Sequence, residues 1–395
     1  MCLAGLCKSK NGRASIVAST GKAWKDAFMD AQILRYLPWV LVLAGICSWG
    51  LAFFTRRWAF RAKALDFPTE ERKIHDAPMP LLGGLGIGIT IVAIIAIAIG
   101  VTGLHGAWLG SNNIETTQVM GFLLGVIILM IGGAVDDRFE LKPSVQILFP
   151  SLAAVVIMAS GTHILHITNW ISGGEFSLVW RVSSAGPFAF LWPADPLTLL
   201  WILTVTYATK FLDGLDGLVS GQTVIGSGLI AGLALTMAFF QPEVALLAMI
   251  VGGAFFGFLP HNMTPAKQFL GESGSTIAGF SLAFLAMLGG AKMATAFIAV
   301  GIPLVDAGVV VAGRLLRGAS PFKGDKTHLH FRLLDLGLKQ KQAVYLMWCL
   351  SLAFGLIAFG LQSAGKIVLI LAIVIVAISL SIYTGKKLRK KNIHG

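Results

Sequence analysis

Two aspartates spaced three residues apart, Asp213 and Asp216, stand between two long apolar runs of the sequence. Each is followed directly by a glycine, which lets a ligand approach the backbone closely. A charged side chain beside a membrane span is costly to bring near lipid, so such residues usually mark function. Two Asp-Gly pairs are also common turn signals, and the pattern alone does not decide between a turn and a site.

A second carboxylate pair, Asp136 and Asp137, ends another apolar run. Two neighbouring carboxylates repel each other unless a proton or a cation lies between them. This suits metal binding by one and proton abstraction or substrate positioning by the other. The alternative is a membrane-boundary pair held by Arg138. Acids at a helix C-terminus oppose the helix dipole, which favours the functional interpretation.

A polar loop over residues 260–275 carries side chains suited to a nucleotide. It offers the amide of Asn262, the ring of Phe269 and the carboxylate of Glu272. The amide and the ring suit a flat base, and the carboxylate suits a cation. On its own, the stretch is equally consistent with a connector between helices.

Residues 326–332 hold four potential cations, Lys326, His328, His330 and Arg332. No third Cys or His lies nearby in the sequence, which disfavours a zinc site. Binding of phosphate oxygens is the favoured interpretation. An ordinary basic loop at the membrane surface would account for the lysine and arginine, but poorly for the two histidines.

The composition indicates an all-α polytopic membrane protein. Of the 395 residues, 56% are hydrophobic and 13% are charged, against about 25% charged in a soluble domain. The mean hydropathy is +0.79, and apolar runs of about 20 residues recur along the chain. The net charge of +12 does not indicate nucleic-acid binding, because the basic residues follow the membrane topology. The four cysteines form no CxxC pair, so neither a zinc site nor a disulfide framework is expected.

We divide the chain into a polar, basic N-terminal tail (1–35), an integral membrane domain (36–384) and a basic cytoplasmic tail (385–395). Met29 is an alternative start. About eleven spans are expected, with ten as the alternative count. They lie near 36–55, 81–104, 118–135, 143–162, 195–212, 218–240, 243–260, 273–290, 293–313, 343–363 and 366–384. The long loop over 163–194 is expected to hold a small hairpin at the interface.

Basic residues concentrate in the loops after odd-numbered spans and in the C-terminal tail. Loops after even-numbered spans hold only Arg181, Lys292 and Lys366. The positive-inside rule therefore places the C-terminus in the cytoplasm and the N-terminus outside, although the basic residues before Met29 contradict the latter. Every cluster described above then lies on the cytoplasmic face, together with the two cations Lys73 and His75.

Carboxylates and phosphate-binding cations at the edge of a bilayer suit phosphoryl transfer between a soluble anionic donor and a lipid phosphate. A secondary transporter is the rival class, but transporters place ionisable residues near the midplane in repeated halves. Here the acids lie in loops on one face, and the sequence holds no internal repeat.

The motifs resemble the polyprenyl-phosphate N-acetylhexosamine-1-phosphate transferases, the MraY/WecA group, from about Asp66 to about Gln342. The matching motifs are, in chain order, Arg72-Lys73-Ile74-His75 with Pro78 and Gly83-Gly84, Asp136-Asp137, Asp213-Gly214-Leu215-Asp216-Gly217, Asn262 through Ser275, and His328-Leu329-His330.

The resemblance implies a fold of ten or eleven helices in the bacterial cytoplasmic membrane, with the active site on the cytoplasmic face. It implies transfer of a sugar 1-phosphate from a UDP-sugar to undecaprenyl phosphate with release of UMP, a Mg²⁺ cofactor, and often a homodimer. The product would feed synthesis of a cell-envelope polysaccharide. A family member that binds lipid phosphate without catalysis is a further alternative.

By the resemblance, Asp136 and Asp137 are the catalytic pair, and one of them deprotonates or orients the lipid phosphate. Asp213 joins the catalytic group, and His328 and His330 match the histidine motif on the pyrophosphate side. The expected substrate-binding residues, including those that hold the uridine, are Lys73, His75, Gly214, Leu215, Asp216, Asn262, Phe269 and Arg332.

The histidine loop reads Asp325-Lys326-Thr327-His328-Leu329-His330, which resembles the WecA/TagO branch. The MraY branch carries a run of three histidines. The resemblance therefore favours UDP-N-acetylglucosamine as donor over UDP-MurNAc-pentapeptide, the donor of peptidoglycan synthesis.

The chain departs from the family at the expected metal site, which comprises Glu272, Asp137 and the position of Lys210. Glu272 stands at the position of the family's metal-binding aspartate, and Lys210 stands at the position of its metal-binding asparagine. A protonated lysine has no lone pair for a metal. We therefore predict that Lys210 and Glu272 face each other at salt-bridge distance. The ammonium would then stand in part for the metal's charge, or displace the metal toward Asp137 and Asp213.

Overall fold

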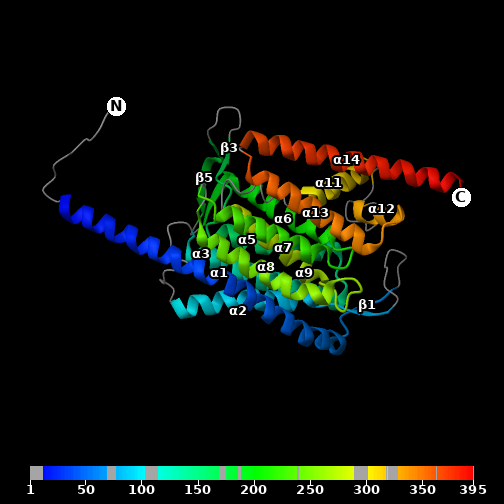
Figure 1. The fold of residues 1–395 in the computed structure, drawn as a ribbon, viewed down its shortest axis with the longest axis horizontal. Coiled ribbons are helices and arrows are strands. Elements are labelled where there is room, and N and C mark those ends of the chain that lie inside the picture. The colour runs from blue at the N-terminus through cyan, green and yellow to red at the C-terminus, as the bar shows by residue number, and fades with distance from the viewer. Residues whose placement is uncertain are drawn as a thin grey trace.

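The computed structural model of the chain describes residues 12–68, 77–102, 114–168, 175–185, 188–237, 240–288, 301–316, 318, 328–361 and 363–394. Most of them are helical, and the helices lie side by side in an elongated bundle (Figure 1). The helices are α1 (Gly12–Ala62), α2 (Gly83–Thr102), α3 (Thr116–Phe139), α4 (Pro143–Gln146), α5 (Leu148–Ala159), α6 (Ala194–Leu212), α7 (Leu218–Ala234), α8 (Pro242–Asn262), α9 (Gly271–Leu288), α11 (Gly301–Leu315), α12 (Leu329–Asp335), α13 (Gln340–Phe359) and α14 (Ser363–His394).

The helices support the expectation of a polytopic membrane protein. Five stretches among the described residues are long and apolar enough to cross a bilayer: Ile33–Ala62, Gly83–Gly100, Thr116–Phe139, Pro242–Asn262 and Gln340–Phe359. Shorter apolar helices cover Pro143–Ala159, Leu218–Ala234 and Gly365–Leu380. Each of the eleven predicted spans overlaps a helix. The number that cross the membrane stays a prediction.

Several helix bounds differ from the predicted spans. Helix α1 is 51 residues long and begins inside the predicted N-terminal tail. The first proline of the sequence is Pro38, so no proline interrupts helix formation in that tail. Helix α14 continues through the basic C-terminal segment to His394. Helix α7 ends at Ala234, short of the predicted 240. The first part of the predicted span 293–313 lies outside the described residues.

Short antiparallel strand pairs lie at both ends of the bundle. Strand β1 (Leu65–Asp66) pairs with β2 (Met79–Pro80). At the opposite end, β3 (His166–Thr168) pairs with β4 (Glu175–Ser177), and β5 (Val179–Ala185) pairs with β6 (Phe188–Pro193). Figure 1 shows β1 and α12 at one end and β3 and β5 at the other. The expectation of a small hairpin within 163–194 is confirmed.

Helix α9 forms the centre of the bundle, packed against α2, α3, α6 and α7. Its residues are all buried except Glu272 and Leu288. Small residues at its start allow this close packing. A Cβ on Gly133 of α3 would overlap the backbone of Ser273, and a Cβ on Gly84 of α2 would overlap the backbone of Gly274. The fold thereby fixes the backbone directly after Glu272, at the end of the bundle that carries β1 and α12.

Candidate active site

A cavity of about 900 Å³ opens where α3, α6, α8 and α9 meet the β1–β2 pair. Ten of the predicted site residues line it together: Asp136, Asp137, Lys210, Asp213, Gly214, Leu215, Asp216, Asn262, Phe269 and Glu272. They come from three segments that are far apart in the sequence. The structure thus brings the carboxylate, Asp-Gly and polar-loop motifs into one cleft, while their individual roles stay predictions.

The vicinal aspartates at the end of α3 are held in different ways. Asp136 Oδ1 accepts hydrogen bonds from Leu141 N (2.9 Å) and Gln146 Nε2 (2.8 Å). Asp137 Oδ1 accepts one from the backbone N–H of Glu272 (2.7 Å). Asp137 Oδ2 is buried and has no hydrogen-bond partner among the described residues. This oxygen is therefore the one that a ligand or a proton can satisfy.

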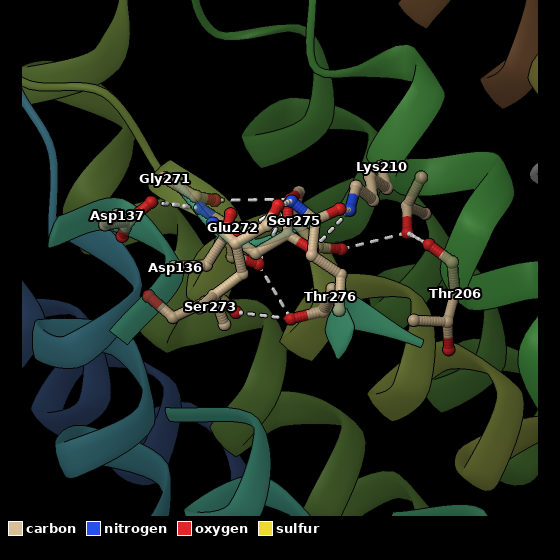
Figure 2. Close-up of polar contacts among 12 residues, drawn as sticks. Asp136, Asp137, Thr206, Lys210, Gly271, Glu272, Ser273, Ser275 and Thr276 are labelled. Carbon is tan, nitrogen blue, oxygen red and sulfur yellow. Dashed lines mark hydrogen bonds and ion pairs between the residues drawn. The ribbon is translucent and has the colours of Figure 1, made fainter. Parts of the chain in front are cut away.

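Lys210 and Glu272 form the predicted ion pair across the cleft, with Lys210 Nζ 2.6 Å from Glu272 Oε1. Figure 2 shows Glu272 between Lys210 and Asp137. Lys210 Nζ also donates to Gln146 Oε1 at 2.7 Å. The predicted contact is confirmed. Gln146 was missed, although it is an isolated polar residue at the start of an apolar run, and such residues are candidates for function.

The Asp-Gly loop closes the cleft between α6 and α7. Asp216 Oδ2 accepts a hydrogen bond from the backbone N–H of Ala266 in the polar loop (3.1 Å). Asp213 faces the cavity. Its side chain is exposed to the cavity. The partial loss of hydration among the surrounding protein atoms, with the charges of Glu272 and Asp216, raises the pKa of Asp213 above its usual value. The loop therefore holds a carboxyl group that keeps its proton more readily than a free aspartate.

Asn262 joins the same loop to the end of α8. Its Oδ1 accepts hydrogen bonds from Gly217 N (3.2 Å) and Ser220 Oγ (2.7 Å), and its Nδ2 donates to Gln268 O (3.2 Å). Gly217 has a φ of +80°, which glycine adopts without strain. The amide that the sequence assigned to the base thus also fixes the Asp-Gly loop against the polar loop, with Phe269 in the cavity wall.

The predicted histidine motif lies behind the cleft. Among the described residues, the cavity lining includes Phe331 but not His328, His330 or Arg332. His330 is fully buried, at 0% exposure. Its Nε2 lies 2.7 Å from where a Cβ on Gly214 would be, so the imidazole supports the Asp-Gly loop from behind. Burial, with the charge of His328, lowers the pKa of His330 to about 3, so its ring is neutral.

A buried aspartate of α11 anchors this motif. Asp306 Oδ2 lies 3.0 Å from His328 Nδ1, and Asp306 Oδ1 accepts the backbone N–H of Leu329 at 2.9 Å. These contacts fasten the start of α12 to α11. Of the other predicted substrate-binding residues, Lys73 and His75 lie outside the described residues.

The expected magnesium site can be tested against the donors that surround it. Magnesium requires several oxygen ligands in near-octahedral geometry. In the described part of the chain, no group of three or more His, Cys, Asp and Glu side chains is arranged to hold a metal ion. The ammonium of Lys210 contacts Glu272 directly. The free Oδ2 of Asp137 could accept a cation, but as a set these residues do not fit a Mg²⁺ bound in the family's manner.

The fold and the cleft define a helical membrane protein with an acidic site at one end of its bundle. A family model described as glycosyl transferase family 4 matches residues 119–290. The probable undecaprenyl-phosphate N-acetylglucosaminyl 1-phosphate transferase of Bacillus subtilis (strain 168) is 32% identical over 78% of this chain and 80% of that protein. The chain belongs to glycosyl transferase family 4, as its motifs indicated.

Two further relatives extend the comparison. The decaprenyl-phosphate N-acetylglucosaminephosphotransferase of Mycolicibacterium smegmatis is 29% identical over 86% of this chain and 88% of that protein. The undecaprenyl-phosphate alpha-N-acetylglucosaminyl 1-phosphate transferase of Escherichia coli (strain K12) is 26% identical over 78% of each. These relatives are named as sugar-phosphate transferases that use a polyprenyl phosphate.

Proposed function

We propose that this chain transfers N-acetylglucosamine 1-phosphate from UDP-N-acetylglucosamine to undecaprenyl phosphate, forming a lipid-pyrophosphate-linked sugar and releasing UMP. The observation that carries the proposal is the single cleft in which Asp136, Asp137, the Asp-Gly loop and Glu272 meet. The names of the relatives support the same donor sugar and acceptor class. The histidine loop favours this donor over UDP-MurNAc-pentapeptide.

The reaction forms one phosphorus–oxygen bond and breaks another. An oxygen of the lipid phosphate attacks the β-phosphorus of the UDP-sugar, and the oxygen that bridges to the α-phosphate leaves with the electron pair on UMP. Asp137, whose Oδ2 is unpaired among the described residues, orients the lipid phosphate or accepts its proton. Asp216, Asn262 and Phe269, which line the same cleft, hold the uridine.

We place the enzyme in the bacterial cytoplasmic membrane as a multi-pass protein, with the cleft and the C-terminus in the cytoplasm and a homodimer as its assembly. A cleft at the end of the bundle lets a water-soluble nucleotide sugar meet a lipid phosphate held at the membrane surface. This placement rests on the distribution of basic residues in the loops.

The proposal is tested with the purified full-length chain in detergent and undecaprenyl phosphate. The donor is UDP-N-acetylglucosamine carrying ³²P in the β-phosphate. We expect label in the lipid fraction and UMP in equal amount. A donor panel with UDP-N-acetylgalactosamine, UDP-glucose and UDP-MurNAc-pentapeptide, with and without Mg²⁺, identifies the sugar. Absence of labelled lipid with every donor, from protein that remains folded, would refute the proposed activity.

A further inference from the structure

Lys210 is the cation at the centre of the acidic cleft. Its ammonium lies 2.6 Å from Glu272 Oε1 and 2.7 Å from Gln146 Oε1. The three residues come from α6, α9 and α4. The side chains of Lys210 and Glu272 are 19% and 16% exposed, so the pair sits in the wall of the cavity and is shielded from bulk water.

The ammonium is connected to both members of the aspartate pair. Gln146 accepts from Lys210 through Oε1 and donates through Nε2 to Asp136 Oδ1 at 2.8 Å. On the other side, the backbone N–H of Glu272 donates to Asp137 Oδ1 at 2.7 Å. The orientation of the Gln146 amide is set by these partners, because a lysine can only donate and a carboxylate can only accept.

This arrangement is unfavourable for a divalent ion bound to Glu272. Lys210 offers no lone pair, and a cation bound to Glu272 would face the ammonium directly and be repelled by it. An ammonium can instead bind phosphate oxygens as a compact point charge. The charge that a metal would bring to this part of the cleft is already present in the chain.

We propose that Lys210, held by Glu272 and Gln146, is the resident cation of this cleft, and that it contacts the pyrophosphate of the nucleotide sugar with no divalent ion bound to Glu272. The assignment of the ligand rests on the proposed function. The assignment of the cation rests on the contacts of Lys210 alone, so the two can fail separately.

The first test measures Mn²⁺ binding to the purified chain, from the loss of the EPR signal of free Mn²⁺. We expect the double variant Lys210→Asn, Glu272→Asp to bind one Mn²⁺ roughly tenfold or more tighter than the wild type. Lys210→Asn combined with Glu272→Gln should lose that site, and Lys142→Asn, which changes an exposed lysine, should behave as the wild type. Wild-type affinity equal to that of the double variant would overturn the proposal.

The second test measures UDP binding by calorimetry in excess EDTA. We expect the wild type to bind UDP without metal. Lys210→Met should bind UDP roughly tenfold more weakly, and the effect of Mg²⁺ on its UDP affinity should differ from the effect on the wild type. Lys210→Arg, which keeps the charge, should lie closer to the wild type, and uridine binding should be unchanged in each variant. A wild type that binds UDP only with Mg²⁺ overturns the proposal. Loss of UMP release with the Mn²⁺ results intact would refute the transferase function alone.

Discussion

Asp136 and Asp137 are adjacent and chemically alike, yet their contacts differ. Asp136 is satisfied by a backbone N–H and by the Gln146 amide. Asp137 keeps Oδ2 buried with no partner among the described residues, and leaving a buried acceptor unpaired costs about 1–3 kcal/mol. A group held at this cost in a ligand-sized cleft is suited to contact the substrate. We therefore expect Asp137 to act on the acceptor phosphate, and Asp136 to position Gln146 and the ammonium bound to it.

Asp137→Asn is expected to lower the rate of UMP release by roughly 100-fold or more, because an amide cannot accept a proton or supply the charge. Asp136→Asn should also abolish turnover: its amide oxygen can still accept from Leu141 N and Gln146 Nε2, but the change removes the negative charge that acts on Asp137 and Glu272. Both changes keep the shape of the side chain, so the thermal unfolding midpoint in detergent should remain near that of the wild type. Glu175→Gln, an exposed change on β4 at the far end of the bundle, is the control. Near-normal turnover in both aspartate variants would contradict these roles.

His330 makes stability depend on pH. Burial, followed by the charge of His328, lowers its pKa from 6.5 to about 3, while Asp306 opposes the shift. Because the folded-state pKa lies below the unfolded value, the stabilising contribution is present above pH 6.5 and is lost as the pH falls toward 3, by up to about 1.4 kcal/mol per pH unit.

The apparent unfolding midpoint in detergent should therefore fall between about pH 7 and about pH 5. His330→Gln should show a smaller fall over the same range, because glutamine does not titrate. His166→Gln, which changes an exposed histidine of β3 at the far end of the bundle, is the matched control and should retain the wild-type slope. Parallel slopes for the wild type and His330→Gln would show that another group controls the acid response.

Close helix packing positions the start of α9, and with it Glu272. A Cβ on Gly133 would overlap the backbone of Ser273. Overpacking of this kind costs about 1–3 kcal/mol, so Gly133→Ala should lower the unfolding midpoint and reduce turnover. Gly228→Ala on α7, where an added Cβ meets nothing within 4 Å among the described residues, should do neither. If the two variants unfold at the same temperature, packing at Gly133 does not hold α9 in place.

Helix α12 shows how a motif can matter without lining the cavity. Asp306 fastens the start of α12 through His328 and the N–H of Leu329. That attachment places His330 against Gly214 and brings Phe331 to the cavity wall. In this arrangement the histidine motif supports the Asp-Gly loop from behind. The predicted contact of the two histidines with the pyrophosphate stays a prediction.

Across the whole molecule, the site residues that could be predicted were charged side chains near apolar runs, which are rare in membrane proteins. Carboxylates at the ends of apolar runs are few, and Asp136, Asp137, Asp213 and Asp216 meet in one cleft. The chain differs from the family at two metal-binding positions, Lys210 and Glu272. This was enough to predict their contact, because a buried ammonium is stabilised by an ion pair with a neighbouring carboxylate. The predicted spans were located because length and hydropathy carry that information.

Other features depend on tertiary contacts that no local pattern encodes. Gln146 and Lys210 are separated by 64 residues, and Asp306 and His328 by 22. The two histidines were predicted to bind phosphate oxygens, yet His330 is fully buried and does not line the cavity. Helix ends also depend on packing and on polar residues that a hydropathy window does not weigh, which is why α1 and α14 extend beyond the predicted spans.

The orientation of the molecule in the membrane is the remaining prediction at this scale. Helix α14 ends at the same end of the bundle as α12 and β1, where the cleft lies, and α1 begins at the opposite end (Figure 1). At 1.5 Å per residue, the 51 residues of α1 extend about 76 Å, against a hydrocarbon core of about 30 Å. We therefore expect the two ends of the bundle to face opposite sides of the membrane, and the basic loops predict that the cleft faces the cytoplasm.

Reporter fusions test this orientation. Green fluorescent protein fused after His394 should fluoresce, and alkaline phosphatase fused there should be inactive, because phosphatase folds only outside the cytoplasm. Alkaline phosphatase fused after Thr236, at the far end of α7, should be active. The reverse pattern would place the cleft outside, away from cytoplasmic nucleotide sugars, and would overturn both the topology and the proposed donor. Alkaline phosphatase active at both positions would instead place the two fusion points on the same side of the membrane, which contradicts the five spans predicted between them.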